Sequence, residues 1–369
     1  MDYKIKRLFL WGRHLQFSPT LTNFFGWQLP LNYQEGILKE AKNTRIRAAL
    51  FDTSHMGRIM IYGEDRFKFL DKLITNNLPS NNRVCYSLLL DEEAKIIDDF
   101  TVYNGEKFLL CVVNASNREK VLGWFNLHKE GKVSIYDDTF ESCFFSLQGP
   151  KSSSLLERLL KDSLDSLGYM DFGIRKIEGI EVLISRSGYT GEDGFELYVK
   201  NKIAEKLWDL IFEEGKKFGL SLAGLGARDI LRVEAGYPLY GNEINLNTHP
   251  FEANLGWVVK YKDKEFIGKE SILKILKTGW GRKRIGFIMQ EKAFPRKGYI
   301  IYDKDEKKAI GEVTSGVYSP NLEKFIGMGY IKKDYTFLDN LIKIKIRDRF
   351  YLAQITKLPF INYRCKLRR

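Results

Sequence analysis

The sequence predicts an α+β fold divided among more than one domain. Its 369 residues are enough for two or three domains that each bury a core. Between residues 52 and 139, apolar patterns follow the order strand, helix, strands, helix, strand, which is typical of a split βαβ, ferredoxin-like unit. From residue 284 onward, short strands separated by turn residues indicate an all-β barrel or sandwich.

Composition and charge narrow the classes of function. The chain is 44% hydrophobic and 29% charged, which is a globular mixture and not a disordered one. A formal net charge of +12 favours anionic ligands in general. Lys and Arg are nevertheless spread along the chain in short clusters such as Arg282-Lys283-Arg284, so we expect no nucleic-acid partner.

Cysteine and histidine positions argue against disulfides and metals. The four cysteines form no Cys-x-x-Cys pair, and Cys111 and Cys143 lie in apolar runs that predict buried thiols. The four histidines have no metal-ligand spacing, so no metal site is expected. There is no signal-peptide pattern and no apolar run of transmembrane length. We therefore expect a soluble, cytoplasmic protein without a membrane partner.

The elements of the first half follow from periodicity and turn residues. Gly26 and Pro30 predict a turn that holds Trp27, and residues 34–49 show a helical pattern. Asp65 is a candidate cap for a helix over 66–76. The remaining elements up to residue 139 are strands at 58–62, 84–90, 96–103, 107–113 and 133–136, and a helix at 117–127.

The second half contains a glycine-rich hairpin. Strands at 181–185 and 195–199 flank a loop that carries Tyr189, Thr190 and Glu192. Strand geometry places Phe195, Leu197 and Val199 on one face and Glu196 on the other. Taken alone, this is equally well an ordinary hairpin with solvated glutamates. The other predicted elements are a strand at 142–148, helices at 150–160, 202–218 and 271–277, and barrel or sandwich strands at 285–290, 298–302, 309–314, 327–330, 342–346 and 349–354. Between them, the glycines of residues 223–234 open a segment that presents Arg228.

Ordered motifs extend over nearly the whole chain. They are Gly26-Trp27, Phe51-Asp52-Thr53-Ser54-His55-Met56-Gly57, Leu73-Ile74-Thr75-Asn76, Ile97-Asp98-Asp99, Val113-Asn114-Ala115, Leu147-Gln148-Gly149-Pro150, Gly188-Tyr189-Thr190-Gly191-Glu192, Gly226-Ala227-Arg228-Asp229, Leu239-Tyr240-Gly241, Phe266-Ile267-Gly268-Lys269-Glu270 and Gly311-Glu312-Val313-Thr314-Ser315-Gly316. With these motifs the chain resembles the T-protein family of the glycine cleavage system, the folate-dependent aminomethyltransferases. Each motif alone is weak evidence for a family, but so many motifs in the same order make the resemblance specific.

The resemblance implies a three-domain clover-leaf fold with folate in a central opening. Its parts would be a discontinuous central α+β domain with an antiparallel sheet that binds folate (1–51 plus 140–262), a ferredoxin-like domain (52–139) and a C-terminal β-barrel (280–369). The family match makes Asp99 the catalytic carboxylate. The residues matched to folate binding are Met56, Tyr86, Asn114, Tyr189, Glu196, Arg228 and Tyr363.

These residue types suit a pterin. Its flat ring calls for aromatic or thioether packing, and its ring N–H donors call for a carboxylate, for which Glu196 on the strand is favoured over Glu192 in the turn. Arg228 could pair with an acidic group such as the folate glutamate tail. The implied partners are tetrahydrofolate, as co-substrate, and lipoylated H-protein. The implied reaction moves a methylene carbon from aminomethylated lipoyl to tetrahydrofolate and releases ammonia.

Several residues are expected to have a structural role and not a functional one. Asp98 and Asp99 adjoin on a strand, so we expect them to face opposite sides, with Asp99 functional. His55 is expected to be structural and to bond backbone, and the tryptophans are expected in the core. Ala94-Lys95 replaces two glycines common in the family, so the loop before Asp99 is expected to be shaped differently.

Two other functions remain open at this level. A folate-dependent demethylase of the same superfamily would share the pocket and differ on the donor side. A non-enzymatic folate-binding accessory protein for iron–sulfur assembly would carry a cysteine signature in the C-terminal half. No cysteine occurs between Cys143 and Cys365, which disfavours that alternative.

Overall fold

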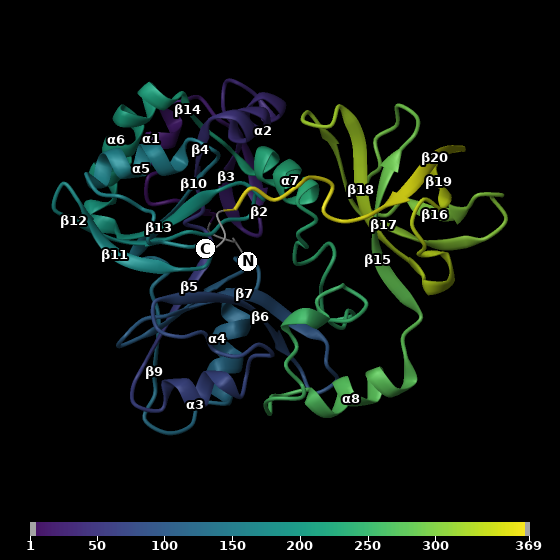
Figure 1. Ribbon diagram of the computed structural model, residues 1–369, viewed down its shortest axis with the longest axis horizontal. Coiled ribbons are helices and arrows are strands. Elements are labelled where there is room, and N and C mark those ends of the chain that lie inside the picture. Colours follow the sequence, from purple (N-terminus) through teal and green to yellow (C-terminus); the bar gives the residue numbers. More distant parts are fainter. Residues whose placement is uncertain (1–4, 366–369) are drawn as a thin grey trace.

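The computed structural model describes residues 5–365. Three lobes surround a common centre (Figure 1). The upper left lobe is built on a six-stranded sheet, the lower left lobe on a five-stranded sheet, and the right-hand lobe is a closed barrel. This arrangement confirms the α+β fold class. The domain boundaries given above stay a prediction.

The six-stranded sheet has the strand order β11-β12-β13-β10-β4-β14. Neighbouring strands are antiparallel except β14, which runs parallel to β4. The strands are β4 (Ala48–Asp52), β10 (Ser142–Gln148), β11 (Phe172–Ile177), β12 (Ile180–Ser185), β13 (Gly194–Lys200) and β14 (Leu220–Leu222). The associated helices are α1 (Trp11–Leu15), α2 (Ile37–Ile46), α5 (Ser152–Leu160), α6 (Asn201–Gly215) and η1 (Lys216–Phe218).

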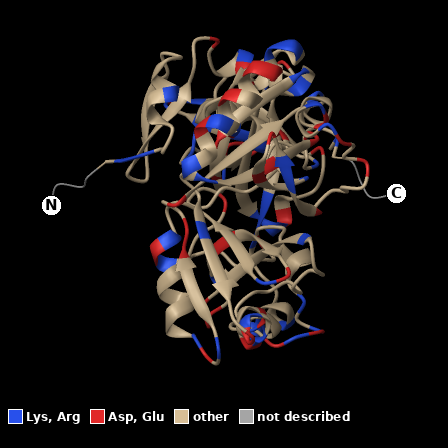
Figure 2. Cartoon of the chain, turned by 90° about the vertical axis from the view of Figure 1, so that its left-hand side faces the viewer, with Lys and Arg blue, Asp and Glu red and all other residues tan. Residues whose placement is uncertain are grey.

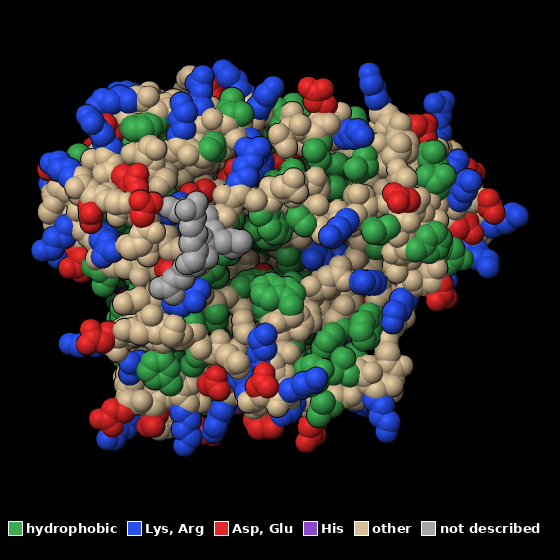
Figure 3. All heavy atoms as spheres, viewed as in Figure 1, with side chains coloured by type: hydrophobic (Ala, Val, Ile, Leu, Met, Phe, Trp, Pro, Cys, Tyr) green, Lys and Arg blue, Asp and Glu red, His purple; other side chains and the backbone are tan. Residues whose placement is uncertain are grey.

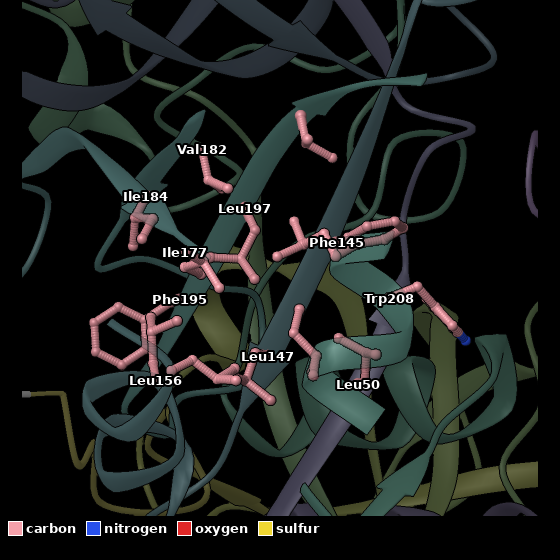
Figure 4. Packing of buried hydrophobic residues seen from close by; sticks show 14 of the residues in the cluster. Leu50, Phe145, Leu147, Leu156, Ile177, Val182, Ile184, Phe195, Leu197 and Trp208 are labelled. Atoms are coloured by element: carbon pink, nitrogen blue, oxygen red, sulfur yellow. The ribbon is translucent and has the colours of Figure 1, made fainter. Parts of the chain in front are cut away.

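Alternation along β10 and β13 builds the core of this lobe. Phe195, Leu197 and Val199 share one face, as predicted, and pack with Phe145 of β10 and Trp208 of α6 in one buried cluster (Figure 4). Glu196 is excluded from this cluster because its side chain leaves the opposite face of β13. The apolar face of the strand therefore fixes where that carboxylate lies.

A small sheet of three strands corrects one prediction. It consists of β1 (Lys6–Arg7), β2 (Thr20–Phe24) and β3 (Trp27–Asn32) in the order β1-β3-β2. Trp27 and Pro30 lie in a strand and not in the predicted turn. The turn is at Phe25 and Gly26, which both have positive φ (49° and 80°), the backbone that a two-residue hairpin turn needs.

The five-stranded sheet has the order β6-β7-β8-β5-β9, with every neighbouring pair antiparallel. Its elements are β5 (Gly57–Tyr62), α3 (Arg66–Asp71), β6 (Arg83–Leu90), β7 (Ile96–Asn104), β8 (Leu109–Val113), α4 (Arg118–Leu127) and β9 (Ser134–Asp137). β8 and β9 both pair with β5 and are joined through α4, so the predicted split βαβ unit is present.

The predicted helix over 66–76 is shorter than expected. α3 ends at Asp71, because Thr75 donates its backbone N–H to Leu88 of β6 and so leaves the helical path. Asp65 does not cap α3 with its side chain; its carboxylate accepts a hydrogen bond from the backbone N–H of Lys132 instead.

The C-terminal strands form a barrel and not a sandwich. They close in the order β15-β18-β17-β16-β19-β20. The strands are β15 (Arg282–Met289), β16 (Ile300–Asp303), β17 (Ala309–Ser319), β18 (Lys324–Lys332), β19 (Leu341–Ile346) and β20 (Arg349–Thr356). α7 (Leu225–Glu234) lies between the six-stranded sheet and the barrel (Figure 1). The remaining elements are η2 (Gly256–Val258), α8 (Lys269–Thr278) and η3 (Lys333–Tyr335).

The segment after β20 returns from the barrel to the six-stranded lobe (Figure 1). The backbone N–H of Arg364 donates to the carbonyl oxygen of Gly191 over 3.0 Å, and that of Phe360 donates to Glu234 over 2.9 Å. Residues 360–364 are thereby held against α7 and the glycine-rich loop between β12 and β13.

Gly149 offers a test of the packing at the start of α5. Its φ is 118°, and a Cβ there would lie 2.5 Å from the carbonyl oxygens of Thr44 and Arg47. We expect Gly149→Ala to lower the free energy of unfolding by about 2 kcal/mol or more, because rigid backbone would have to move. Urea-unfolding midpoints measure this.

Gly123 in α4 is the matched control, since no atom lies within 4 Å of its hypothetical Cβ. Gly123→Ala should raise stability by roughly 0.5–1 kcal/mol through helix propensity. Equal destabilisation by both substitutions would contradict the argument from close packing.

Candidate functional site

One cavity of about 1500 Å³ lies where the three lobes meet. Figure 3 shows hydrophobic side chains near the centre of the molecule with some Lys and Arg beside them, and a mixture of Lys, Arg, Asp and Glu toward the rim. The side view in Figure 2 shows the same mixing of charges. All eight residues predicted as site residues line the cavity: Met56, Tyr86, Asp99, Asn114, Tyr189, Glu196, Arg228 and Tyr363.

Two adjacent aspartates on β7 form the first polar feature of the site. Asn114 donates from its single Nδ2 to Asp98 Oδ1 at 2.8 Å and to Asp99 Oδ1 at 2.7 Å. Tyr86 donates from Oη to Asp99 Oδ2 at 2.8 Å. Asp98 is fully buried and also accepts from Asn117 at 2.7 Å, whereas Asp99 lines the cavity.

These two carboxyl groups lie on opposite faces of β7, as expected. β7 pairs regularly with β6 from Asp98 onward, with Asp98 opposite Leu89 and Asp99 opposite Leu88, and these two leucines belong to different buried clusters. Asn114 directly follows the end of β8, from where its amide reaches both carboxyl groups.

Burial raises the pKa of both carboxyl groups. The charge of Asp99 raises the pKa of Asp98 further, while hydrogen bonds from Tyr86 and Asn114 partly offset the rise at Asp99. The two groups titrate as a pair. Asp99 is the member that lines the cavity, so it can stabilise a positive charge or accept a proton there.

Glu196 is held by hydroxyl groups on the far side of the cavity. Its Oε2 accepts from Ser187 Oγ at 2.6 Å and from Tyr103 Oη at 3.0 Å. Glu192 is buried away from the cavity and pairs with Arg45 at 3.1 Å. Of the two glutamates, Glu196 therefore lines the cavity, and Glu192 does not.

Aromatic rings form one wall. Tyr189 stacks on Tyr237 with centroids 5.5 Å apart, and Tyr237 stacks on Tyr363 at 5.6 Å. Tyr363 donates its hydroxyl to the carbonyl oxygen of Ala235 at 2.8 Å, and Tyr189 donates to that of Pro238. Arg228 lies over the Tyr189 ring, 4.8 Å from its centroid.

Sequence reasoning missed Tyr237 and Trp257. Tyr237 has no local pattern that marks it, because only the fold brings it between two tyrosines from distant segments. Trp257 stacks on Tyr86 with centroids 6.0 Å apart and is 63% exposed. It contradicts the expectation of core tryptophans, which Trp27 and Trp208 do meet.

The loop before Asp99 accommodates its unusual residues. Ala94 has a φ of 61°, the left-handed backbone for which glycine is favoured. Lys95 closes the loop: its backbone N–H donates to Asp91 Oδ1 at 2.7 Å, and its carbonyl oxygen accepts from Asp91 at 3.0 Å. The loop thus takes a glycine-type backbone with alanine in place.

Residues 5–365 contain no cluster of metal-ligand side chains and no helix that could span a membrane. No three His, Cys, Asp or Glu side chains of these residues converge as metal ligands would. None of the helices in this part of the chain is long and apolar enough to cross a membrane.

Two family models together match most of the chain. The model described as the GCVT N-terminal domain matches residues 10–263, and the glycine cleavage T-protein C-terminal barrel domain matches residues 282–362. The chain belongs to the glycine cleavage T-protein family.

Named relatives and a solved structure agree with this membership. An aminomethyltransferase of Halothermothrix orenii is 42% identical, over 97% of this chain and 100% of the relative. One of Caldanaerobacter subterraneus subsp. tengcongensis is 40% identical, over 98% and 97%. The crystal structure of glycine cleavage system aminomethyltransferase T from Bartonella henselae superposes with a TM-score of 0.91 at 30% identity, covering 98% of this chain and 99% of that one. The protein is an enzyme of the aminomethyltransferase family.

A buried ion pair joins this site to the barrel. Arg232 of α7 contacts Glu243 at 2.7 Å, and both are almost fully buried. Thr314 and Ser315 of β17 complete the network: Thr314 donates to Glu243 at 2.6 Å, and Arg232 donates to Ser315 at 2.7 Å. Burial opposes ionisation of Glu243, but the charge of Arg232 and hydroxyl hydrogen bonds leave its pKa below the usual value.

We expect Glu243→Gln to lower the free energy of unfolding by about 2–3 kcal/mol near neutral pH, because the buried Arg232 would lose one of its two carboxylate partners and keep only Asp229, 2.7 Å away. Since the pKa of Glu243 is lowered in the folded state, its stabilisation is present above the unfolded pKa and is lost as pH falls through the folded pKa. The difference between wild type and variant should therefore shrink in acid. Urea unfolding at several pH values measures it.

Glu119→Gln provides the control, because Glu119 is 78% exposed and pairs with Arg118 at 3.0 Å and with Lys6 at 3.7 Å. Loss of these exposed ion pairs should lower the free energy of unfolding by less than about 1 kcal/mol. A Glu243→Gln variant as stable as this control would show that the buried pair does not hold the lobes together.

Proposed function

We propose that this protein is the aminomethyltransferase of the glycine cleavage system. It would transfer the methylene carbon from aminomethylated lipoyl on the H-protein to tetrahydrofolate, releasing ammonia and forming 5,10-methylenetetrahydrofolate. The observation that carries the proposal is Asp99, a half-buried carboxylate that lines a cavity of about 1500 Å³ in a chain of this family. The names of the relatives support the same activity.

The cavity suits tetrahydrofolate in shape and chemistry. The tyrosine stack and the Tyr86–Trp257 pair offer flat apolar faces for a ring system. Glu196 accepts pterin N–H donors, and its position is fixed by Ser187 and Tyr103. Met56 and Asn114 complete the pterin pocket, and Arg228 and Tyr363 complete the binding set.

Asp99 is the proposed catalytic group. When ammonia leaves the aminomethyl group and the carbon passes to N5 and then bridges N5 and N10, a carbon–nitrogen cation develops. A carboxylate held by Tyr86 and Asn114 stabilises that cation and accepts the proton that N10 loses. A pKa raised by burial brings Asp99 closer to neutral pH, where a proton acceptor is most effective.

The partners and location belong to the same proposal. We propose lipoylated H-protein as donor and the cytoplasm as location. The cysteines Cys85, Cys111, Cys143 and Cys365 are free, which suits a reducing compartment.

We expect Asp99→Asn to lower turnover by about 10²-fold or more while folate affinity changes little, because the amide keeps the shape but removes the charge and the proton acceptor. Ammonia and methylenetetrahydrofolate are measured from aminomethylated H-protein and tetrahydrofolate, and affinity is measured by calorimetry. The exposed Asp305→Asn is the control.

An equal fall in affinity and turnover would make Asp99 a binding residue and not a catalytic one. If the wild-type protein binds folate but shows no turnover above a folate-only blank, the proposed transferase activity is wrong.

The two glutamates of the hairpin should behave differently. Glu196→Gln should weaken folate binding by about 10–100-fold, since a charged acceptor is replaced by a neutral amide. Glu192→Gln should mainly reduce stability, because it breaks the buried pair with Arg45. Calorimetry and thermal melts on both variants separate the effects; loss of binding in Glu192→Gln alone would reverse the assignment.

A further inference from the structure

A second, much smaller cavity lies beside the main one. Its volume is about 20 Å³, and Pro30, Asp52 and Gly224 are among the residues that line it. His55 and Arg228 line both cavities, so these two side chains form part of the wall between them.

Two nitrogen atoms of this wall lack partners. His55 Nδ1 and Arg228 Nη1 are both buried and make no hydrogen bond to protein. His55 was expected to bond backbone, and Nδ1 does not do so. Its ring makes an edge contact with Phe24, with centroids 5.7 Å apart. Buried polar atoms without partners are costly, and two at one small cavity indicate a shared polar neighbour.

We propose that one water molecule in this cavity accepts a hydrogen bond from Arg228 Nη1 and donates one to His55 Nδ1, which makes His55 a positioning residue for Arg228. A single water requires about 10–15 Å³ of such space, so the cavity holds one water and excludes larger molecules. Water fits the chemistry, because an arginine nitrogen only donates whereas a neutral imidazole nitrogen can accept.

The electrostatics of the wall are compatible with this arrangement. Burial, together with the charge of Arg228, lowers the pKa of His55 to about 3, so the imidazole is neutral at physiological pH. Acceptance at Nδ1 then places the imidazole proton on Nε2. The opposing charges around His55 are Asp52, which favours protonation, and Arg58, which disfavours it.

The proposed water would affect the main cavity through Arg228. Its guanidinium lies over the Tyr189 ring at 4.8 Å, in the wall that also contains Tyr237 and Tyr363. When Nη1 is hydrogen-bonded, the Arg228 side chain has fewer rotamers open to it. The side chain therefore loses less conformational entropy when an anionic group of a ligand binds. His55 therefore acts on the cavity through the water and Arg228.

The test does not depend on the folate reaction. Long-range ¹H–¹⁵N NMR of the wild-type protein resolves the four histidines, and His55→Phe assigns the resonances of His55. We expect His55 to show protonated Nε2 and acceptor Nδ1 from pH 5 to 8, with a nuclear Overhauser effect from water. A high-resolution crystal structure should show one water within hydrogen-bond distance of both nitrogens. A protonated Nδ1, or a cavity without a water bonded to both, would overturn the proposal.

Ligand affinity tests the positioning role. His55→Phe should weaken tetrahydrofolate binding several-fold, His55→Gln should restore part of the loss by supplying an acceptor, and His128→Phe should have no effect. Unchanged affinity in a folded His55→Phe variant would overturn the positioning role. Failure of the wild-type protein to bind folate would refute the proposed function and leave the NMR and crystallographic test of the water intact.

Discussion

The buried charges near the end of α7 are the interactions on which the site most depends. Arg232 pairs with Glu243 and contacts Ser315 of the barrel. Glu234 pairs with Arg45 of α2 and accepts from Ser319 of β17 at 2.5 Å. Arg232 and Glu234 are two residues apart on α7, and their side chains connect the six-stranded lobe with the barrel. A buried ion pair is not by itself strongly stabilising, but losing one partner is costly, so it fixes the geometry of the parts it joins.

That fixed geometry lets one cavity collect residues from distant segments. Tyr86 and Asp99 come from the five-stranded sheet, Glu196 comes from the six-stranded sheet, and Tyr363 lies near the end of the chain. The apolar faces of the strands set the direction of each polar side chain. Each carboxylate is then oriented by hydroxyl or amide donors, so little reorganisation is needed when a cation develops or a ring binds.

The aspartate pair shows what strand patterning predicts and what it leaves open. Alternation places adjacent residues on opposite faces, and the rule holds for Phe195, Leu197 and Val199 because β13 pairs regularly over its length. It also holds for Asp98 and Asp99, because β7 pairs regularly with β6 from Asp98 onward. That the amide of Asn114 bonds both carboxyl groups depends on where the chain leaves β8, which the residues of β7 alone do not reveal.

The sequence by itself determined the fold class, the order of most helices and strands, and membership of the T-protein family. Local periodicity and ordered motifs carry that information. The family resemblance also pointed to eight of the residues that line the cavity, but not to Tyr237 or Trp257. Tertiary structure alone decided that Asn114 contacts both aspartates, that Tyr237 lies between Tyr189 and Tyr363, and that His55 and Arg228 share a small cavity. The physical reason is that these contacts join residues far apart in the chain, whose relative positions depend on packing between lobes and not on local backbone preference.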